Sequence, residues 1–108
     1  LGFPTANIEV DFKLSLPKPG VYVTKTRVGE RIYRSITNVG FNPTFNQKTY
    51  NIETYIMDFN KNIYGEEVEV IFLHRIREEI KFSNIDDLCQ KINEDVSYTR
   101  EYFKTIDA

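Results

Sequence analysis

Alternation of apolar and polar residues predicts β-strands through the first part of the chain. Residues 20–37 are rich in Val, Ile, Tyr and Thr, and Val28-Gly29-Glu30 can turn the chain near their middle, so a β-hairpin is expected there. Residues 49–57 and 66–73 alternate with a period of two, which predicts two further strands. In the first of these strands, Glu53 falls on a face that mixes polar and apolar side chains.

The spacing of apolar residues becomes helical after Lys81. Ser83 and Asp86 resemble a capping box, in which side chains bond the free N–H groups at the start of a helix. The residues that follow at helical spacing are Ile85, Leu88, Ile92, Val96 and Phe103. They predict one amphipathic helix that closes the chain.

Strands followed by a single helix favour an antiparallel sheet or barrel with the helix packed outside it. The stretches 11–19 and 38–48 lack a regular pattern and are predicted to be loops. Because loops often carry binding residues, both are candidates for contact with a ligand.

Length, charge and cysteine content narrow the class of protein. The 108 residues suffice for one domain, taken as residues 1–108, and 41% hydrophobic residues can build its core. A formal net charge of -2 offers no general attraction to nucleic acid, and no apolar run is long enough to cross a membrane. A single cysteine, Cys89, is expected to be structural and fits a reducing cytoplasm.

Near the amino terminus, Thr5 and Asn7 carry two neutral oxygen atoms at a spacing of two residues. Pro4 favours extended backbone before it, and in an extended chain both side chains would project to one side. Hydroxyl and amide oxygens suit Mg²⁺, which the phosphates of a nucleotide would then hold in place. The alternative is that both side chains bond backbone groups in a turn.

Glu53 and two arginines are further candidates. A carboxylate in the middle of a strand lies either in solvent or in a pocket, where it could serve as a general base. Arg75 and Arg77 are two residues apart and could share a face, as an anion-binding or ring-stacking patch or as a solvated strand end. His74 has no neighbour at a metal-ligand spacing, which argues against a metal role.

Taken in order, several short segments carry a family resemblance. They are GFPTAN near the start, GVY, NVGFNPTF, IETYIMDF, IYG, IREEIKF and the closing helix. In this order the chain resembles, essentially from end to end, the riboflavin kinase module, which in bacteria is mostly the carboxyl-terminal half of a bifunctional riboflavin kinase/FAD synthetase. The resemblance implies a six-stranded antiparallel Greek-key β-barrel with a helix packed outside. It also implies that ATP phosphorylates riboflavin at the ribityl 5′-hydroxyl, giving FMN and ADP, with Mg²⁺ as cofactor.

The resemblance also assigns roles to single residues. Thr5 and Asn7 match the residues that hold Mg²⁺ and contact the ATP phosphates, and Glu53 matches the catalytic base. The other matches are Tyr64 and Gly65 in a turn near the nucleotide, Arg77 and Phe82 in the segment over the flavin ring, and Asn38 and Pro43-Thr44 in a loop beside the active site.

One departure from the family concerns the amino terminus. Members usually carry a strand and a glycine-containing basic loop before the first landmark, so this chain is expected to lack its first strand and to belong to a longer protein with an FAD synthetase (adenylyltransferase) domain. Two alternatives to a kinase are a non-catalytic barrel that binds flavin or nucleotide and a barrel that binds single-stranded nucleic acid through its aromatic residues. The acidic balance argues against the second.

Overall fold

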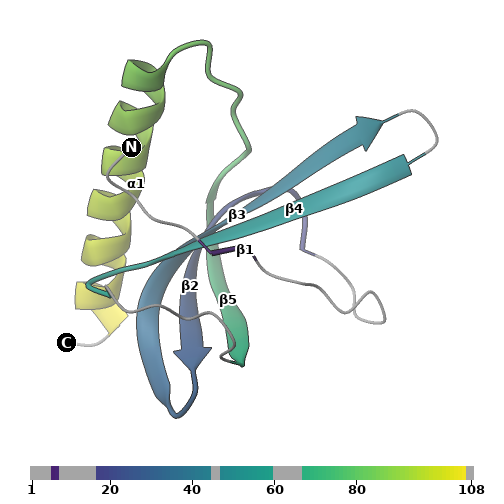
Figure 1. Ribbon diagram of the computed structural model, residues 1–108. Coiled ribbons are helices and arrows are strands. Elements are labelled where there is room, and N and C mark those ends of the chain that lie inside the picture. Colours follow the sequence, from purple (N-terminus) through teal and green to yellow (C-terminus); the bar gives the residue numbers. More distant parts are fainter. Residues whose placement is uncertain (1–5, 8–16, 45–46, 60–66, 107–108) are drawn as a thin grey trace.

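The computed structural model describes residues 6–7, 17–44, 47–59 and 67–106. The elements found there are β1 (Ala6–Asn7), β2 (Gly20–Val28), β3 (Arg31–Thr44), β4 (Gln47–Ile56), β5 (Val68–Arg77) and α1 (Ile85–Ile106) (Figure 1). All pairings among the described strands are antiparallel, in the order β1-β4-β3-β2-β5. The prediction of a mainly β fold with a closing helix is confirmed, whereas a six-stranded barrel stays a prediction.

The predicted hairpin is formed by β2 and β3. Val28 pairs with Arg31, so Gly29 and Glu30 make the turn. Gly29 has a φ of 61°, a left-handed conformation that a residue without a Cβ adopts freely. The other two predicted strands correspond to β4 and β5, with ends shifted by a few residues.

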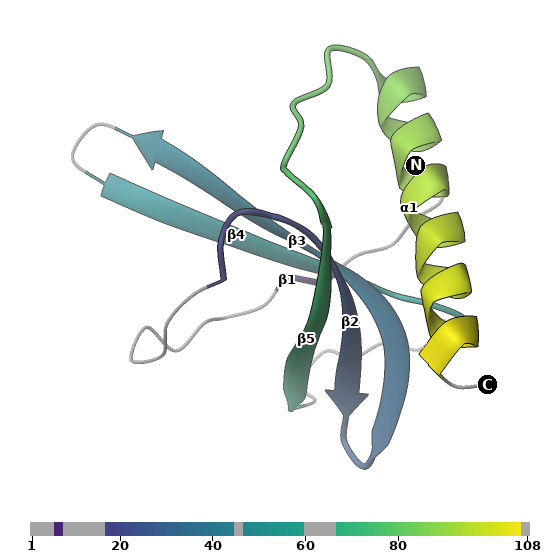
Figure 2. The ribbon, with the colours of Figure 1, turned by 180° about the vertical axis from the view of Figure 1, so that it is seen from behind.

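The prediction of a loop over 38–48 is wrong for the described residues of this stretch, because residues 38–44 pair with residues 47–53. β3 continues to Thr44 and β4 begins at Gln47. β2 pairs with β3 only as far as Val39, so the rest of β3 and β4 forms a ribbon that projects from the sheet (Figures 1 and 2). A two-stranded ribbon tolerates Pro43, since a residue without an N–H can stand on an unpaired strand edge.

Helix α1 lies along one face of the sheet (Figure 2). Its N-cap is Asn84, whose Oδ1 accepts a hydrogen bond from the backbone N–H of Asp87 at 2.9 Å, while Nδ2 donates to the Asp87 carboxylate at 3.0 Å. The predicted capping box at Ser83 and Asp86 is therefore wrong by one residue, because asparagine caps a helix as well as serine does. No helix in the described parts of the chain is long and apolar enough to span a membrane.

The second half of α1 packs against the sheet. Val96 packs against the sheet, and Phe103 is fully buried with the guanidinium of Arg34 5.2 Å from its ring centroid. Ile85, which the spacing assigned to this stripe, is 66% exposed because it lies at the first helical position, beyond the sheet. Asp95 and Thr99 are buried instead.

Hydrophobic clusters cover both faces of the sheet. On the face toward α1 the buried cluster is Val21, Ile36 and Met57, with Tyr55, Ile76 and Val96 packed against it. On the other face it is Tyr22, Val39 and Ile52, with Tyr50 and Phe72 packed against it. Successive residues of a strand point to opposite faces, which explains why β2, covered on both sides, is buried over most of its length.

Buried hydroxyl groups connect three strands on the face away from α1. This hydroxyl network consists of Thr24, Thr26, Ser35, Thr37 and Thr54, each no more than 1% exposed. Thr26 bonds Ser35 at 2.7 Å, Ser35 bonds Thr24 at 2.7 Å, Thr24 bonds Thr37 at 2.9 Å, and Thr37 bonds Thr54 at 2.9 Å. The network ties β2, β3 and β4 together, and every buried hydroxyl in it has a hydrogen-bond partner.

Candidate active site

A cavity of about 510 Å³ lies between the sheet, α1 and the segment that joins β5 to α1. This volume falls in the range of small-molecule binding sites. Its walls are formed by Val21, Ile36, Asn38, Gly40, Asn51, Glu53, Tyr55, Arg77, Glu79, Ile80, Lys81, Phe82, Leu88, Ile92 and Asp95. The set includes Glu53, Asn38, Arg77 and Phe82, which the sequence proposed from three separate segments.

One row of residues crosses the whole sheet and carries most of these candidates. The register matches Asn7 with Glu53, Glu53 with Asn38, Asn38 with Val21, and Val21 with Arg77. Directly opposed residues in a sheet present their side chains on the same face. We call these five residues the site row. It aligns the strand positions of the predicted metal-binding, catalytic and flavin-contacting segments across the sheet.

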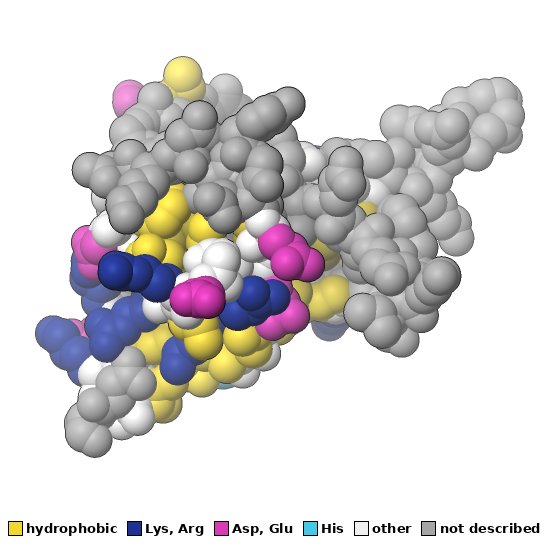
Figure 3. Space-filling view, turned by 60° about the horizontal axis from the view of Figure 1, so that its bottom comes forward, with side chains coloured by type: hydrophobic (Ala, Val, Ile, Leu, Met, Phe, Trp, Pro, Cys, Tyr) yellow, Lys and Arg dark blue, Asp and Glu magenta, His cyan; other side chains and the backbone are white. Residues whose placement is uncertain are grey.

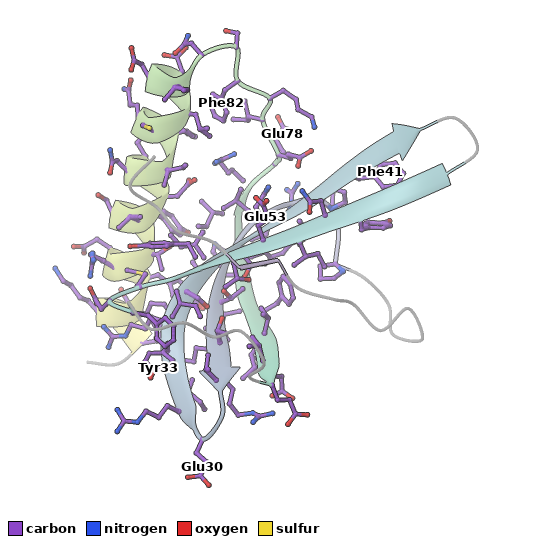
Figure 4. All side chains as sticks on the ribbon, viewed as in Figure 1. Glu30, Tyr33, Phe41, Glu53, Glu78 and Phe82 are labelled. Carbon is purple, nitrogen blue, oxygen red and sulfur yellow. The ribbon has the colours of Figure 1, made fainter. Side chains whose placement is uncertain are left out.

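Glu53 is the second residue of the site row, next to Asn7. It extends from β4 into the space beside α1 and the segment after β5, and it is partly buried (Figure 4). Among the described residues, none makes a hydrogen bond or ion pair with its carboxylate. A partly buried carboxylate at a cavity wall, with its oxygens unpaired in this part of the chain, can accept a hydrogen bond or a proton from a ligand.

Arg77 stands at the other end of the site row and is held by α1. Its Nε donates to Asp95 Oδ1 at 3.0 Å and its Nη2 to Asp95 Oδ2 at 2.8 Å, which is a bidentate ion pair. The side chains are 15% and 6% exposed. Nη1 also donates to the backbone carbonyl of Glu78 at 3.1 Å. The guanidinium plane is therefore fixed at the cavity wall.

The prediction that Arg75 and Arg77 could share a face is wrong. A β-bulge lies between Val21 and Tyr22, so Val21 pairs with Arg77 whereas Tyr22 pairs with Arg75. Val21 and Tyr22 point to opposite faces, and their partners follow them. Arg75 instead donates from Nη2 to the carbonyl of Pro19 at 2.8 Å.

The segment 78–84 covers one side of the cavity. It leaves β5 and runs beside α1 to the start of the helix (Figure 1), and Glu79, Phe82 and their neighbours line the cavity from it. Glu79 lies over Gly40 of β3, where an added Cβ would be 2.4 Å from Glu79 Oε2. The missing side chain at position 40 therefore makes room for the carboxylate of Glu79.

Charges of both signs line the cavity. The acidic groups are Glu53, Glu79 and Asp95, and the basic groups are Arg77 and Lys81. Glu79 and Lys81 form a loose ion pair at 3.8 Å. Because Asp95 already pairs with Arg77, the described residues supply no excess positive charge to neutralise a phosphate.

Several predicted site residues lie outside what the structure describes. Thr5, Tyr64 and Gly65 belong to the parts that it leaves out, and Asn7 is described only by its strand pairing. The pair Pro43-Thr44 lies in the β3–β4 ribbon and not in a loop, roughly 16 Å along the strand from Asn38 at about 3.3 Å per residue.

Sequence reasoning missed other residues at the cavity, namely Gly40, Asn51, Glu79 and Asp95. For Asp95 a signal existed. It lies three residues after Ile92 and four before Thr99, on the stripe of α1 that faces the sheet. An acidic residue on the buried stripe of a helix needs a partner, and that requirement could have pointed to Arg77.

Neither a depression on the outer side of α1 nor His74 supports a catalytic role. A shallow depression of about 680 Å³ runs along the outer side of α1 and is lined by residues of that helix alone, including Cys89. His74 bonds the Tyr98 hydroxyl through Nε2 at 2.9 Å. In the described residues, no three His, Cys, Asp or Glu side chains are grouped as a metal site would require.

Comparison with known proteins identifies the family. A sequence model of the Flavokinase family, described as riboflavin kinase, matches residues 1–103. The bifunctional riboflavin kinase/FMN adenylyltransferase of Haemophilus influenzae is 43% identical over 107 residues, which cover 97% of this chain and 34% of that protein. The chain spans about a third of the length of the curated relatives it matches.

Solved structures share the fold. The riboflavin kinase of Trypanosoma brucei is 30% identical with a TM-score of 0.74, over 96% of this chain and 70% of that one. A Streptococcus pneumoniae structure described as a macrolide-efflux protein is 39% identical with a TM-score of 0.87, over 92% of this chain and 33% of that one. Together with the family match over residues 1–103, this similarity in sequence and fold shows that the chain belongs to the riboflavin kinase family.

Proposed function

We propose that this domain transfers the terminal phosphate of ATP to the 5′-hydroxyl of riboflavin and releases FMN and ADP. The observation that carries the proposal is Glu53, whose carboxylate lines a cavity of ligand size and has no partner among the described residues. Membership of the riboflavin kinase family supports the choice of substrate.

In the proposed reaction, Glu53 acts as the general base. The ribityl 5′-hydroxyl donates a hydrogen bond to the carboxylate and passes its proton there as the oxygen attacks the terminal phosphorus. A new oxygen–phosphorus bond forms, and the bond from that phosphorus to the bridging oxygen of ADP breaks. Such a transfer needs positioning and charge neutralisation more than covalent catalysis.

Magnesium is the proposed cofactor, and Thr5 and Asn7 are the residues that would hold it. Asn7 pairs with Glu53, so its strand position fits an ion next to the base. A neutral hydroxyl and carboxamide suit Mg²⁺ bound mainly by phosphates. When bound, the ion supplies the positive charge that the described cavity residues lack.

The flavin ring is proposed to occupy the end of the cavity near Arg77 and Phe82. Apolar side chains from β2 and α1 also line the cavity, among them Val21, Leu88 and Ile92. An aromatic ring and apolar walls bury a flat heterocycle favourably, and the planar guanidinium can stack on it or donate to its oxygen atoms. Asn38, between Arg77 and Glu53 in the site row, is proposed to orient the ribityl chain.

The wider assignments are proposals as well. The relatives carry an FMN adenylyltransferase function, so we propose that the full-length protein includes an FAD synthetase domain. The six-stranded closed barrel, a role of Tyr64 and Gly65 near the nucleotide, and a cytoplasmic location stay predictions from the family resemblance.

The deciding experiment is to incubate the purified protein with riboflavin, ATP and Mg²⁺ and to separate the flavins by chromatography. We expect FMN to form at a rate proportional to enzyme, with one ADP for each FMN. If folded protein quenches riboflavin fluorescence but forms no FMN, the chain is a flavin-binding barrel without catalytic function, and the proposal is refuted.

A nucleic-acid-binding function has little support on the face formed by the β2–β3 hairpin and the end of α1. Asp and Glu side chains are mixed there with Lys and Arg (Figure 3). Arg27 pairs with Glu69 at 3.7 Å and Lys104 with Glu101 at 3.2 Å. Binding to phosphate backbones requires unpaired positive charge.

A further inference from the structure

Asp95 is buried although it is acidic. It is 4% exposed and lies in the middle of α1, on the side that faces the sheet. Its two carboxylate oxygens both accept hydrogen bonds from Arg77. A buried ion pair adds little net stability compared with apolar residues of similar size, because removing both charges from water is costly. Stability alone therefore does not explain why this pair is present.

The pair lies in the cavity wall. Arg77 and Asp95 both line the cavity that contains Glu53. Three donors of Arg77 are accounted for by Asp95 and the Glu78 carbonyl, and no other bond of this guanidinium is found among the described residues. The remaining N–H groups and the flat face of the guanidinium are the surfaces that a ligand can contact.

The pair also anchors the segment that covers the cavity. Residues 78–84 begin directly after Arg77 and end at Asn84, which caps α1. Asp95 is ten positions beyond Ile85, which corresponds to about 15 Å along the helix axis. The ion pair therefore fixes the end of β5 against the middle of α1, while the N-cap fixes the other end of the segment.

The site row separates this anchor from the chemistry. Between Arg77 and Glu53 lie three strand-to-strand steps, through Val21 and Asn38. At about 4.8 Å per step, the two residues are roughly 14 Å apart across the sheet. A residue that acts through Arg77 should therefore affect the binding of the flavin ring and leave phosphoryl transfer to the 5′-hydroxyl largely unaffected.

From these observations we propose that Asp95 is a positioning residue for the flavin ring: it holds the Arg77 guanidinium at the cavity wall and fixes the segment 78–84 over the ligand. The proposal rests on the proposed function for the identity of the ligand. It does not require that Asp95 touch riboflavin or take part in phosphoryl transfer.

The first test uses Asp95→Asn, with Asp86→Asn as the matched control. Asp86 is exposed on the same helix and has no hydrogen-bond or ion-pair partner among the described residues, so the control makes the same chemical change away from the cavity. For Asp95→Asn we expect the KM for riboflavin to rise about ten- to hundredfold, the range of a charge-assisted hydrogen bond, with the KM for ATP and kcat within about threefold. Asp86→Asn should change none of them.

The binding of lumiflavin, a flavin ring without the ribityl chain, tests the role of Asp95 independently of the transfer reaction. Lumiflavin should inhibit competitively, and Asp95→Asn should weaken its binding by the same factor as that of riboflavin. Asp95→Glu should recover part of the affinity, because it can again pair with Arg77. A loss of kcat and of affinity for ATP together with affinity for riboflavin would show a merely structural role and would overturn the proposal.

A second variant covers the possibility that Asp95→Asn fails to fold. Replacing the pair together, Arg77→Met with Asp95→Leu, removes both buried charges and should keep the fold. We expect this double variant to turn over at saturating riboflavin but to bind riboflavin and lumiflavin about tenfold or more weakly, by fluorescence quenching. Wild-type affinity in a folded double variant would overturn the proposal. If wild-type protein makes no FMN, the kinase proposal fails, whereas these binding measurements still decide the role of Asp95.

Discussion

Thr37 occupies the middle of the buried hydroxyl network, and its replacement by valine tests how much that network contributes. Its hydroxyl bonds Thr24 at 2.9 Å on one side and Thr54 at 2.9 Å on the other. In Thr37→Val, Thr24 keeps Ser35 as a partner at 2.7 Å. Thr54, which is 1% exposed, has no second side-chain partner among the described residues.

The expected loss follows from that difference. A buried hydroxyl left without a partner costs about 1–3 kcal/mol, so we expect Thr37→Val to lower the free energy of unfolding by about 2 kcal/mol. For a domain of this size, that corresponds to a fall in Tm of roughly 10 °C. Thr54→Val should cost about 1 kcal/mol, because Thr37 would still bond Thr24.

Urea unfolding followed by far-ultraviolet circular dichroism measures both changes. The double variant Thr37→Val/Thr54→Val removes the unpaired hydroxyl, so it should be less destabilised than the sum of the single variants by about 1 kcal/mol. Additive losses, or a Thr37→Val variant no less stable than Thr54→Val, would refute the reasoning. The KM for riboflavin should stay unchanged, because the hydroxyls lie on the face away from the cavity.

Further changes test the site and the helix. Glu53→Gln should lower kcat by about 10²- to 10⁴-fold and change the KM for riboflavin by less than about threefold, in steady-state assays of FMN formation; equal losses in both would argue against a base. Gly40→Ala should displace the Glu79 carboxylate, since the new Cβ would lie 2.4 Å from Oε2, and should weaken riboflavin binding by fluorescence titration without unfolding the protein. Asn84→Ala should lower the free energy of unfolding by about 1 kcal/mol through loss of the N-cap, which thermal denaturation can detect; an unchanged Tm would contradict this assignment of the cap.

Local sequence patterns predicted most strands, the turn and the helix well, because the formation of each of these elements depends mainly on residues close together in the sequence. The turn at Gly29 and the strand around Glu53 were predicted from residue type and period alone. The face of Glu53 followed from the same alternation. Where the prediction failed, at the loop over 38–48, the deciding factor was pairing of residues 38–44 with residues 47–53, which the local pattern of residues 38–44 does not reveal.

The candidate site depends on the register with which distant strands pair, and this register could not be predicted from the sequence. Asn38, Glu53 and Arg77 are far apart in the chain and meet because each occupies one position in the site row. A shift by one residue in any strand would turn its candidate to the other face, as the bulge beside Tyr22 does for Arg75. Family resemblance supplied the residues, and only the pairing brings them to one cavity.

The two ends of the site row are supported by different parts of the molecule. Behind Glu53 and Asn38, the neighbouring residues Thr54 and Thr37 join β4 to β3 through the hydroxyl network. Arg77 is instead joined to α1 by its ion pair. Because a buried network and a helix contact are independent supports, the position of Glu53 does not depend on the position of the segment 78–84. If the proposed function is correct, the strands that carry Glu53 can keep their register while a flavin enters or leaves beside this segment.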